Sequence, residues 1–181
     1  MGKIFTLVGP SGSGKTTLGR HLKDMGLVEL VSHTTRDMRA KEIEGITYYF
    51  ISEDEFEKLD KVESVRYSGK NYALARSEVD NKLAAYKNVF VIVDVMGLRQ
   101  LKEIYKDKIV SIFIEVTLAE MMERMARRGD SDKTIMDRVH YALGNSELEQ
   151  GHMCDYTIRN DDIQVAKDSL EKIIQKEVNM C

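Results

Sequence analysis

The residues best suited to chemistry lie near the amino end of the chain, in the run 9–16. This run, Gly-Pro-Ser-Gly-Ser-Gly-Lys-Thr, fits the pattern G-x-x-x-x-G-K-[ST] and directly follows the apolar stretch 4–8. Glycines let the backbone curl so that successive N–H groups face one point and can bind phosphate oxygens. The sequence therefore predicts a nucleoside triphosphate site, against the alternative of a glycine-rich turn that happens to contain a lysine.

Individual positions in this run have separate predicted tasks. Lys15 can reach the outer phosphates, and the Thr16 hydroxyl is placed to ligate Mg²⁺. A helix expected from about 16 to 25 would point its positive end at the same phosphates. The phosphate-binding residues expected from the pattern are Gly9, Ser11, Gly12, Ser13, Gly14, Lys15, Thr16 and Thr17.

A second candidate for phosphate binding is the polar segment 32–39, which carries Arg36 and Arg39. The planar guanidinium of arginine matches a phosphate, and two of them beside tyrosine hydroxyls can hold a dianion. Tyr48 and Tyr72 are the tyrosines that we expect there. The alternative is that both arginines lie on a solvated face.

Three more arginines flank a polar hinge at 129–132. Arg124 and Arg128 are four residues apart and share a helix face, and Arg138 follows the hinge. Phosphoryl transfer needs positive charge over the migrating group and exclusion of water, which a hinged flap can supply. A solvated arginine face is the alternative interpretation.

Asp94 is the candidate metal ligand outside the glycine-rich run. It follows the apolar residues 89–93, and so it lies at the carboxyl end of an expected central strand. An acid at that place can hold Mg²⁺ or its waters. A turn residue at a strand end is the alternative.

Short apolar runs alternate with helical patterns along the chain, which predicts a parallel sheet covered by helices. The expected class is α/β, of the P-loop NTPase type, with three αβα layers around a central parallel sheet. The expected strands are 4–8, 88–94, 109–115 and 156–159, and the expected helices after the first are 117–128, 130–149 and 161–178.

The segment 32–84 interrupts this alternation. It is polar and mixed, with strand-like pieces at 47–51 and 62–67 and a helix cap at 52–55. We interpret it as an inserted lobe that binds the second substrate. The chain 1–181 is then one domain, with a core of 1–31 and 85–181, the lobe at about 32–84 and a short lid at about 128–138.

Length, charge and cysteine content limit the kinds of protein that this chain can be. A chain of 181 residues with 43% hydrophobic content can bury one good core. Its net charge of −3 gives no argument for a nucleic-acid or membrane partner, and we expect no signal or membrane-spanning segment. The two cysteines, Cys154 and Cys181, suit reduced thiols in a cytoplasmic protein rather than a disulfide framework, and with His152 they do not make a zinc site.

Taken in order, these fragments resemble the guanylate kinase family over nearly the whole chain. The resemblance lies in the ordered series Gly-Pro-Ser-Gly-Ser-Gly-Lys at 9–15, Val-Ser-His-Thr-Thr-Arg at 31–36, Arg39, Glu42, Gly45 and Tyr48, Tyr-Ser-Gly-Lys-Asn-Tyr at 67–72, Arg-Arg-Gly-Asp at 127–130, Arg138, and Arg-Asn-Asp-Asp at 159–162. It implies transfer of the γ-phosphate of ATP to GMP or dGMP with Mg²⁺, in a monomer or homodimer.

The resemblance also implies roles for individual residues. The acceptor phosphate would be held by Arg36, Arg39, Tyr48 and Tyr72, and its base would face Ser32 and Glu63. Arg124, Arg128 and Arg138 would bridge the two substrates, Lys15 would be catalytic with them, and Asn160 would contact the donor adenine. A carboxylate suits guanine, because it accepts from the ring N–H and the exocyclic amine together.

Two positions depart from the family pattern. Leu74 stands where the family usually has a serine or threonine that reads guanine, and Met96 stands where it usually has a second aspartate. Two alternatives therefore remain open. A kinase of the same fold would phosphorylate another ester such as ribose 1,5-bisphosphate, and a guanylate-kinase-like module would bind peptides without catalysis. The intact Lys15 and Thr16 disfavour the second alternative.

Overall fold

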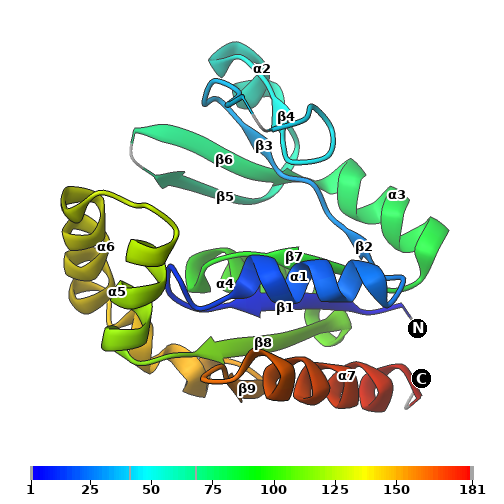
Figure 1. Cartoon of the computed structure of the whole chain (residues 1–181). Helices are drawn as coiled ribbons and strands as arrows, with labels where there is room; N and C mark the ends of the chain where they lie inside the picture. Colours follow the sequence, from blue (N-terminus) through cyan, green and yellow to red (C-terminus); the bar gives the residue numbers. More distant parts are fainter. Residues whose placement is uncertain (1, 41, 68, 180–181) are drawn as a thin grey trace.

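A five-stranded parallel sheet forms the centre of the computed structural model, which describes residues 2–40, 42–67 and 69–179 (Figure 1). The strand order is β2-β7-β1-β8-β9, and every neighbouring pair is parallel. The strands are β1 (Ile4–Val8), β2 (Val28–Glu29), β7 (Val89–Ile92), β8 (Ile109–Glu115) and β9 (Tyr156–Arg159). All four predicted strands are present, and the one expected at 88–94 is shorter.

Helices cover both faces of this sheet, as the three-layer class requires. On one face, α1 (Lys15–Asp24) and α7 (Ile163–Asn179) pack on Phe5 and Leu7 of β1. On the other, α3 (Arg76–Tyr86) and α4 (Val95–Tyr105) pack on Ile4 and Val8. Successive residues of β1 thus enter opposite cores, because side chains alternate along a strand. The predicted α/β fold class is confirmed.

The inserted segment forms a second, mixed sheet above the first (Figure 1). Its strand order is β4-β3-β6-β5, with β3 (His33–Thr34), β4 (Tyr49–Phe50), β5 (Lys61–Tyr67) and β6 (Lys70–Ala75). The short helix α2 (Glu53–Lys58) begins at Ser52, whose side chain forms the predicted cap with Glu55. Strands β3 and β6 were not expected: β3 has only two residues, and the apolar residues 72–75 of β6 were not recognised as a strand.

The last helical region lies at one end of the central sheet. It comprises α5 (Leu118–Arg127), α6 (Asp132–Gly144) and the 3₁₀ turn η2 (Glu147–Met153), whereas the 3₁₀ turn η1 (Lys106–Lys108) joins α4 to the start of β8 at the other end of the sheet. The capping box at Thr117 is confirmed. The predicted helix 130–149 is wrong at its ends, because α6 stops at Gly144 and Ser146 has a left-handed φ of 51°. Helices α3 and α4 were not predicted.

Two further predictions concerned membrane-spanning segments and the state of the cysteines. No helix within the described residues is long and apolar enough to cross a membrane. Cys154 is a half-buried free thiol, and burial raises its pKa to about 11. Cys181, the other predicted reduced thiol, lies outside the described residues.

Candidate nucleotide-binding site

The glycine-rich run forms a tight loop between β1 and α1. Ser13 N donates to Pro10 O at 3.2 Å, and the first helical bond runs from Leu18 N to Gly14 O at 3.0 Å. Gly14 has φ 98°, and a Cβ there would lie 2.3 Å from Asn160 Nδ2. The loop therefore needs glycine at this position for both its backbone angle and the close approach of Asn160.

Lys15 reaches back across the loop into the cavity above it. Its Nζ donates to Gly9 O at 2.6 Å and to Pro10 O at 2.8 Å. Burial lowers its pKa to about 8, although the negative charge of Glu147 acts in the opposite direction. The two carbonyl groups thus hold the ammonium group at the wall of the cavity, and its predicted contact with phosphate stays a prediction. Thr16 and Thr17 follow on exposed positions of α1.

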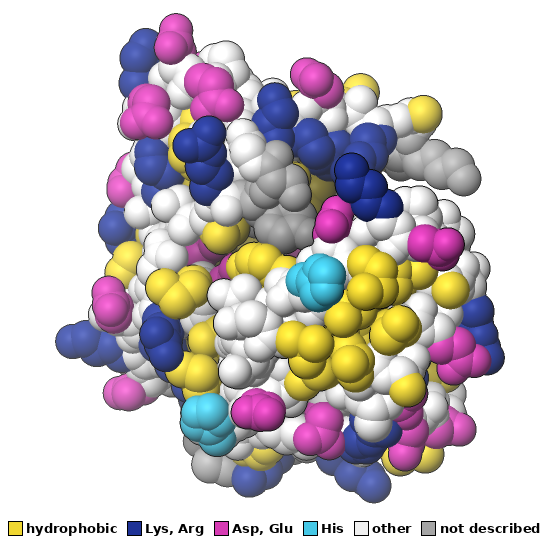
Figure 2. Space-filling model, turned by 90° about the vertical axis from the view of Figure 1, so that its left-hand side faces the viewer, with side chains coloured by type: hydrophobic (Ala, Val, Ile, Leu, Met, Phe, Trp, Pro, Cys, Tyr) yellow, Lys and Arg dark blue, Asp and Glu magenta, His cyan; other side chains and the backbone are white. Residues whose placement is uncertain are grey.

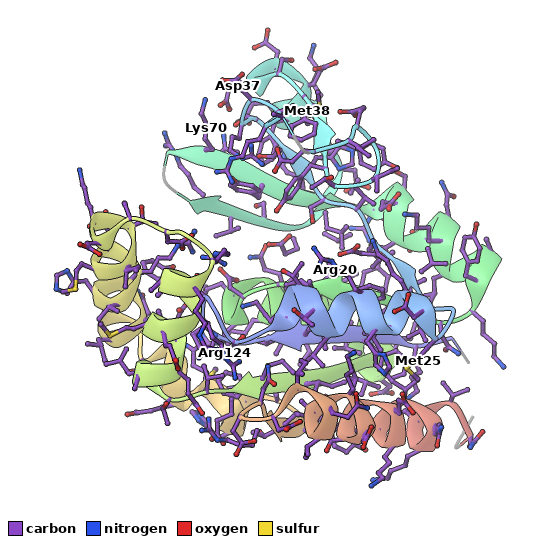
Figure 3. All side chains as sticks on the ribbon, in the orientation of Figure 1. Arg20, Met25, Asp37, Met38, Lys70 and Arg124 are labelled. Carbon is purple, nitrogen blue, oxygen red and sulfur yellow. The ribbon has the colours of Figure 1, made fainter. Side chains whose placement is uncertain are left out.

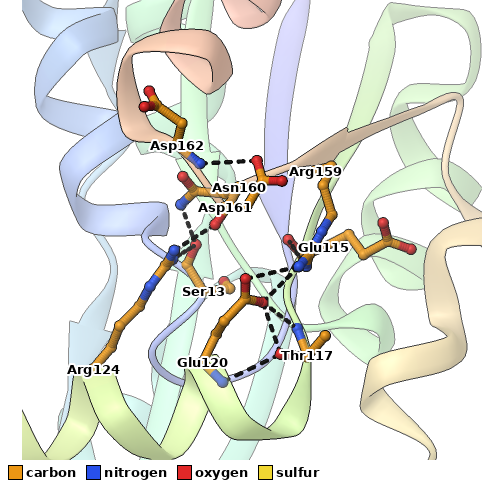
Figure 4. Close-up of polar contacts among 9 residues, drawn as sticks. All are labelled: Ser13, Glu115, Thr117, Glu120, Arg124, Arg159, Asn160, Asp161 and Asp162. Atoms are coloured by element: carbon orange, nitrogen blue, oxygen red, sulfur yellow. Dashed lines mark hydrogen bonds and ion pairs between the residues drawn. The ribbon is translucent and has the colours of Figure 1, made fainter.

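Two predicted ligand residues support this loop from below (Figure 4). Asn160 is 1% exposed, and its Nδ2 donates to Ser13 O at 2.6 Å. Arg124 donates to the same carbonyl at 3.4 Å and, through Nη2, to Asn160 O. Both side chains thus hold the loop backbone. Their predicted contacts with phosphate and adenine stay predictions.

A second set of contacts fixes the start of α5 under the loop (Figure 4). Arg159 Nη2 lies 2.7 and 2.8 Å from the two carboxylate oxygens of Glu120. The pKa of Glu120 falls to about 2, first because it accepts from the backbone of Thr117 and then because of Arg159. These contacts join β9 to the helix that carries Arg124.

Replacing Asn160 with alanine should destabilise the protein, because the buried Ser13 carbonyl would lose its shortest hydrogen bond. We expect a loss of about 1–3 kcal/mol in the free energy of unfolding, measured by urea titration. Asn145→Ala is the control, since its exposed side chain also donates to a carbonyl, that of Tyr141, at 2.8 Å. Equal losses in the two variants would contradict a special role for Asn160.

A cavity of about 400 Å³ lies between the loop and the lobe. Its lining residues are Gly9, Ser11, Lys15, Ser32, Arg36, Arg39, Glu42, Tyr48, Glu63, Val65, Tyr72, Ile92, Val93, Asp94, Arg138, Tyr141 and Glu147. All six residues predicted to bind the acceptor are among them, although they come from positions 32 to 72. The structure thus brings three of the predicted donor residues, Gly9, Ser11 and Lys15, to one space with the acceptor residues. The other predicted donor residues do not line the cavity: Gly12, Ser13, Gly14, Thr16, Thr17 and Asn160.

Charge is unevenly distributed around this space. Figure 2 shows Lys and Arg side chains gathered on the lobe half of one face and an apolar patch on the half formed by α5 and α6. In Figure 3, Arg20 and Arg124 lie below the lobe, which carries Asp37, Met38 and Lys70. Four cationic side chains line the cavity itself: Arg36 and Arg39 come from the lobe, and Lys15 and Arg138 come from the core.

Glu42 holds the arginine segment of the lobe in place. Its Oε1 lies 2.7 Å from Arg36 Nη2, and its Oε2 accepts from Arg39 N at 2.8 Å. The ring centroids of Tyr48 and Tyr72 are 5.8 Å apart beside Arg36. Burial raises the pKa of Tyr48, which therefore stays a hydroxyl donor. Sequence reasoning assigned Glu42 no role, although an acid six residues after Arg36 is a usable signal.

Glu63 is the buried acid of the cavity. It is 5% exposed, and its pKa rises to about 7, mainly through burial and then through the negative charge of Asp94. A Cβ at Gly97 would lie 2.9 Å from Glu63 Oε1, so glycine leaves room for this carboxyl group. Leu74, paired with Glu63 across the lobe sheet, is 0% exposed, and Met96 is 55% exposed. Neither lines the cavity.

Asp94 occupies the strand-end place that the sequence predicted. Its Oδ1 accepts from Gly97 N at 2.8 Å and so caps α4, while the residue also lines the cavity. The alternative interpretation, a turn residue at a strand end, therefore describes part of the role of Asp94. Its predicted contact with Mg²⁺ stays a prediction.

The remaining predicted arginines lie in different surroundings. Arg138 lines the cavity and donates through Nη1 to Ser11 Oγ. Arg128 pairs with Asp130, with Nε 3.0 Å from Oδ1, and lies outside the lining. Glu147 and Tyr141 are cavity residues that sequence reasoning missed. No local signal marked them, because the segment was expected to continue as one helix.

The chain is similar to known proteins over nearly its whole length. The family model described as "Guanylate kinase" matches residues 1–177. A guanylate kinase of Agrobacterium fabrum is 36% identical over 184 residues, covering 97% of this chain and 83% of the relative.

Solved structures give the same picture at the level of the fold. The crystal structure of guanylate kinase from Anaplasma phagocytophilum superposes with a TM-score of 0.74 at 27% identity, covering 97% of this chain and 86% of the other. A shikimate kinase from Acinetobacter baumannii superposes with a TM-score of 0.53 at 19% identity, covering 98% and 93%, which shows a shared fold alone.

Proposed function

The chain belongs to the guanylate kinase family, and we propose that it transfers the γ-phosphate of ATP to GMP or dGMP, giving ADP and GDP or dGDP. The single observation that carries this proposal is the shared cavity. Lys15 lies at its donor end, and Arg36 and Glu63 lie on the lobe side. Phosphoryl transfer depends on such an arrangement, because most of its catalysis is positioning and charge.

The lobe would bind the acceptor by its two ends. Arg36 and Arg39, with the hydroxyls of Tyr48 and Tyr72, would hold the phosphate. Ser32 and the ionised carboxylate of Glu63 would face the base, where a carboxylate accepts two hydrogen bonds from guanine. No general base is required, since the attacking phosphate oxygen is already ionised.

The core would bind the donor. The N–H groups of the glycine-rich loop and Lys15 would hold the triphosphate, Asn160 would contact adenine, and Arg124 would act from below the loop. Arg138 would stabilise the charge on the migrating phosphoryl group, and Arg128 would join it when the segment 128–138 closes as a lid. Closure would also exclude water, so that phosphate passes to the acceptor and not to solvent.

Two residues beside the loop would hold Mg²⁺. The Thr16 hydroxyl and the Asp94 carboxylate are oxygen donors, which this cation prefers; Asp94 lines the cavity, whereas Thr16, the second residue of α1, does not. When bound, the ion would neutralise charge on the donor phosphates. The chain's own part is to hold these two oxygens in place, for Asp94 through its cap on α4.

An acceptor panel tests this proposal. ADP release from Mg·ATP would be measured with GMP, dGMP, AMP, CMP, UMP and ribose 1,5-bisphosphate. We expect turnover with GMP or dGMP and none with the sugar phosphate. Turnover with ribose 1,5-bisphosphate alone would overturn the acceptor assignment and leave the donor assignment standing, whereas ATP binding without any turnover would favour a binding module.

The proposal also covers the location, the assembly state and the partners of the protein. We place the protein in the cytoplasm, as a monomer or homodimer whose partners are small nucleotides and not nucleic acid or membrane. Sedimentation with and without both nucleotides distinguishes the two assembly states.

A further inference from the structure

The lobe is joined to the core by two crossings of the chain, and one partly buried acid at the start of α3 contacts the outgoing crossing. The outgoing crossing leaves β2 through Leu30 and Val31, and the returning crossing enters α3 at Arg76 (Figure 1). Glu78 lies in the first turn of α3, and its side chain is only 9% exposed. A carboxylate buried to this degree needs partners, and here they come from different parts of the hinge.

The first partner lies on the outgoing crossing. Val31 N donates to Glu78 Oε1 at 2.7 Å, across 47 positions of sequence. On the core side, the preceding residue stays in register with the central sheet, since Leu30 N donates to Phe90 O at 2.8 Å. On the lobe side, Ser32 O accepts from Tyr49 N at 2.9 Å. Glu78 therefore contacts the outgoing chain between its last core bond and its first lobe bond.

The second and third partners fix the acid to the helix and to the lobe. Lys82, one turn further along α3, lies 2.6 Å from Glu78 Oε1 and donates to Glu29 O at 2.8 Å. Tyr49 OH makes a longer contact of 3.5 Å with Glu78 Oε2, and the ring of Tyr49 lies on that of His33, with centroids 4.7 Å apart. The helix, the outgoing crossing and β4 thus meet at one side chain.

The helix itself belongs to the core. Val79, the neighbour of Glu78, is fully buried in the core cluster that contains Ile4 and Leu101. Glu78 therefore reaches from an element packed on the central sheet to a strand of the lobe. These contacts therefore link the core to the outgoing crossing and to the lobe through one side chain.

We propose that Glu78 is a positioning residue that sets the orientation of the acceptor lobe relative to the glycine-rich loop. It touches no substrate; it acts through Val31 and Tyr49, which adjoin the acceptor-site residues Ser32 and Tyr48. The inference rests on the proposed function for its kinetic part, because it assumes that the lobe binds the acceptor and the core binds ATP. The structural part, that Glu78 sets the orientation of the lobe, does not rest on the proposed function.

The kinetic test compares Glu78→Ala with Glu78→Gln. In the alanine variant, kcat/KM for GMP should fall about tenfold, while KM for ATP should stay within about twofold. The glutamine variant should show a smaller fall, because its side-chain oxygen can still accept from Val31 while the charge that pairs with Lys82 is lost. Partial rescue of this kind distinguishes positioning from a general loss of folding.

The matched control is Glu171→Ala. Glu171 Oε1 lies 2.7 Å from His21 Nε2, so this variant also removes a contact between distant helices, but one inside the core. Both substrates should keep their kinetic constants in the control. Equal losses for GMP and ATP in Glu78→Ala, or the same losses in Glu171→Ala, would overturn the proposal, as would unchanged constants in Glu78→Ala.

Small-angle X-ray scattering of the free proteins gives a readout that does not depend on the acceptor. A lobe released at its hinge should give Glu78→Ala a larger radius of gyration than the wild type, with an unchanged value for Glu171→Ala. Identical radii would contradict the proposal. If the wild type fails to phosphorylate GMP, the proposed function fails, and the scattering comparison still decides the role of Glu78.

Discussion

Replacement of Lys15 by methionine should lower kcat with GMP by about a thousandfold, because one fixed charge over the migrating phosphoryl group contributes about that much. Methionine keeps the buried methylene volume and removes only the ammonium group. Steady-state ADP release at saturating substrates measures the effect. Lys23→Met on the same helix is the control, since Lys23 pairs with Glu29 away from the cavity, and it should stay within about twofold of the wild type.

The variant must be shown to fold, because Lys15 Nζ also donates to two loop carbonyls. Urea unfolding of Lys15→Met provides that check. Retained turnover in a folded variant would contradict the phosphate role of the glycine-rich loop. The pH profile offers a second test. With a pKa of about 8, Lys15 loses its charge as the pH rises through that value, so kcat/KM for ATP should decline on that side.

Replacement of Glu63 by glutamine should lower kcat/KM for GMP by about a hundredfold or more, with KM for ATP nearly unchanged. The amide can accept one hydrogen bond from guanine but presents its NH₂ donor where the second acceptor is needed. Glu57→Gln, an exposed position on α2, is the control and should behave as the wild type. An unaltered kcat/KM for GMP in Glu63→Gln would show that this residue does not read the base.

The raised pKa of Glu63 adds a pH dependence with a defined sign. Below about pH 7 the carboxyl group in the free protein is protonated, so it cannot accept two hydrogen bonds. The value of kcat/KM for GMP should therefore fall as the pH drops through about 7, because kcat/KM reports the ionisation of the free enzyme. This limb should be absent from the profile of Glu63→Gln, and its persistence there would assign it to another group.

Local sequence patterns predicted many of the strands and helix caps of the fold. The apolar runs of β1, β7 and β8 are largely buried on both faces, and such strands are continuous in sequence, whereas the edge strand β9 buries only Ile158. The caps at Ser52 and Thr117 also depend only on residues three apart. Strand β3 could not be predicted in the same way, since two residues carry no periodicity and its pairing with β6 joins distant segments.

Helix α4 was also not predicted, but for a different reason from strand β3. Its residues include the buried Leu98 and Leu101, and Asp94 caps it through Gly97, so a helical pattern was present in the sequence. Asp94 was predicted as a metal ligand, and its Oδ1 accepts from Gly97 N and caps the helix. One side chain serves the fold with one oxygen and lines the cavity as well, and sequence motifs do not separate these roles.

By itself, the sequence determined the glycine-rich loop with Lys15, the order of the core strands along the chain and the family pattern, because each depends on residues close together in sequence. Tertiary structure alone decided that Asn160 and Arg124 hold the loop from below, that Leu74 packs in a core, and that Glu147 faces Lys15 across the cavity. The physical reason is that these contacts join positions far apart in sequence. They follow from strand order and from the placement of the lobe, which no short segment encodes.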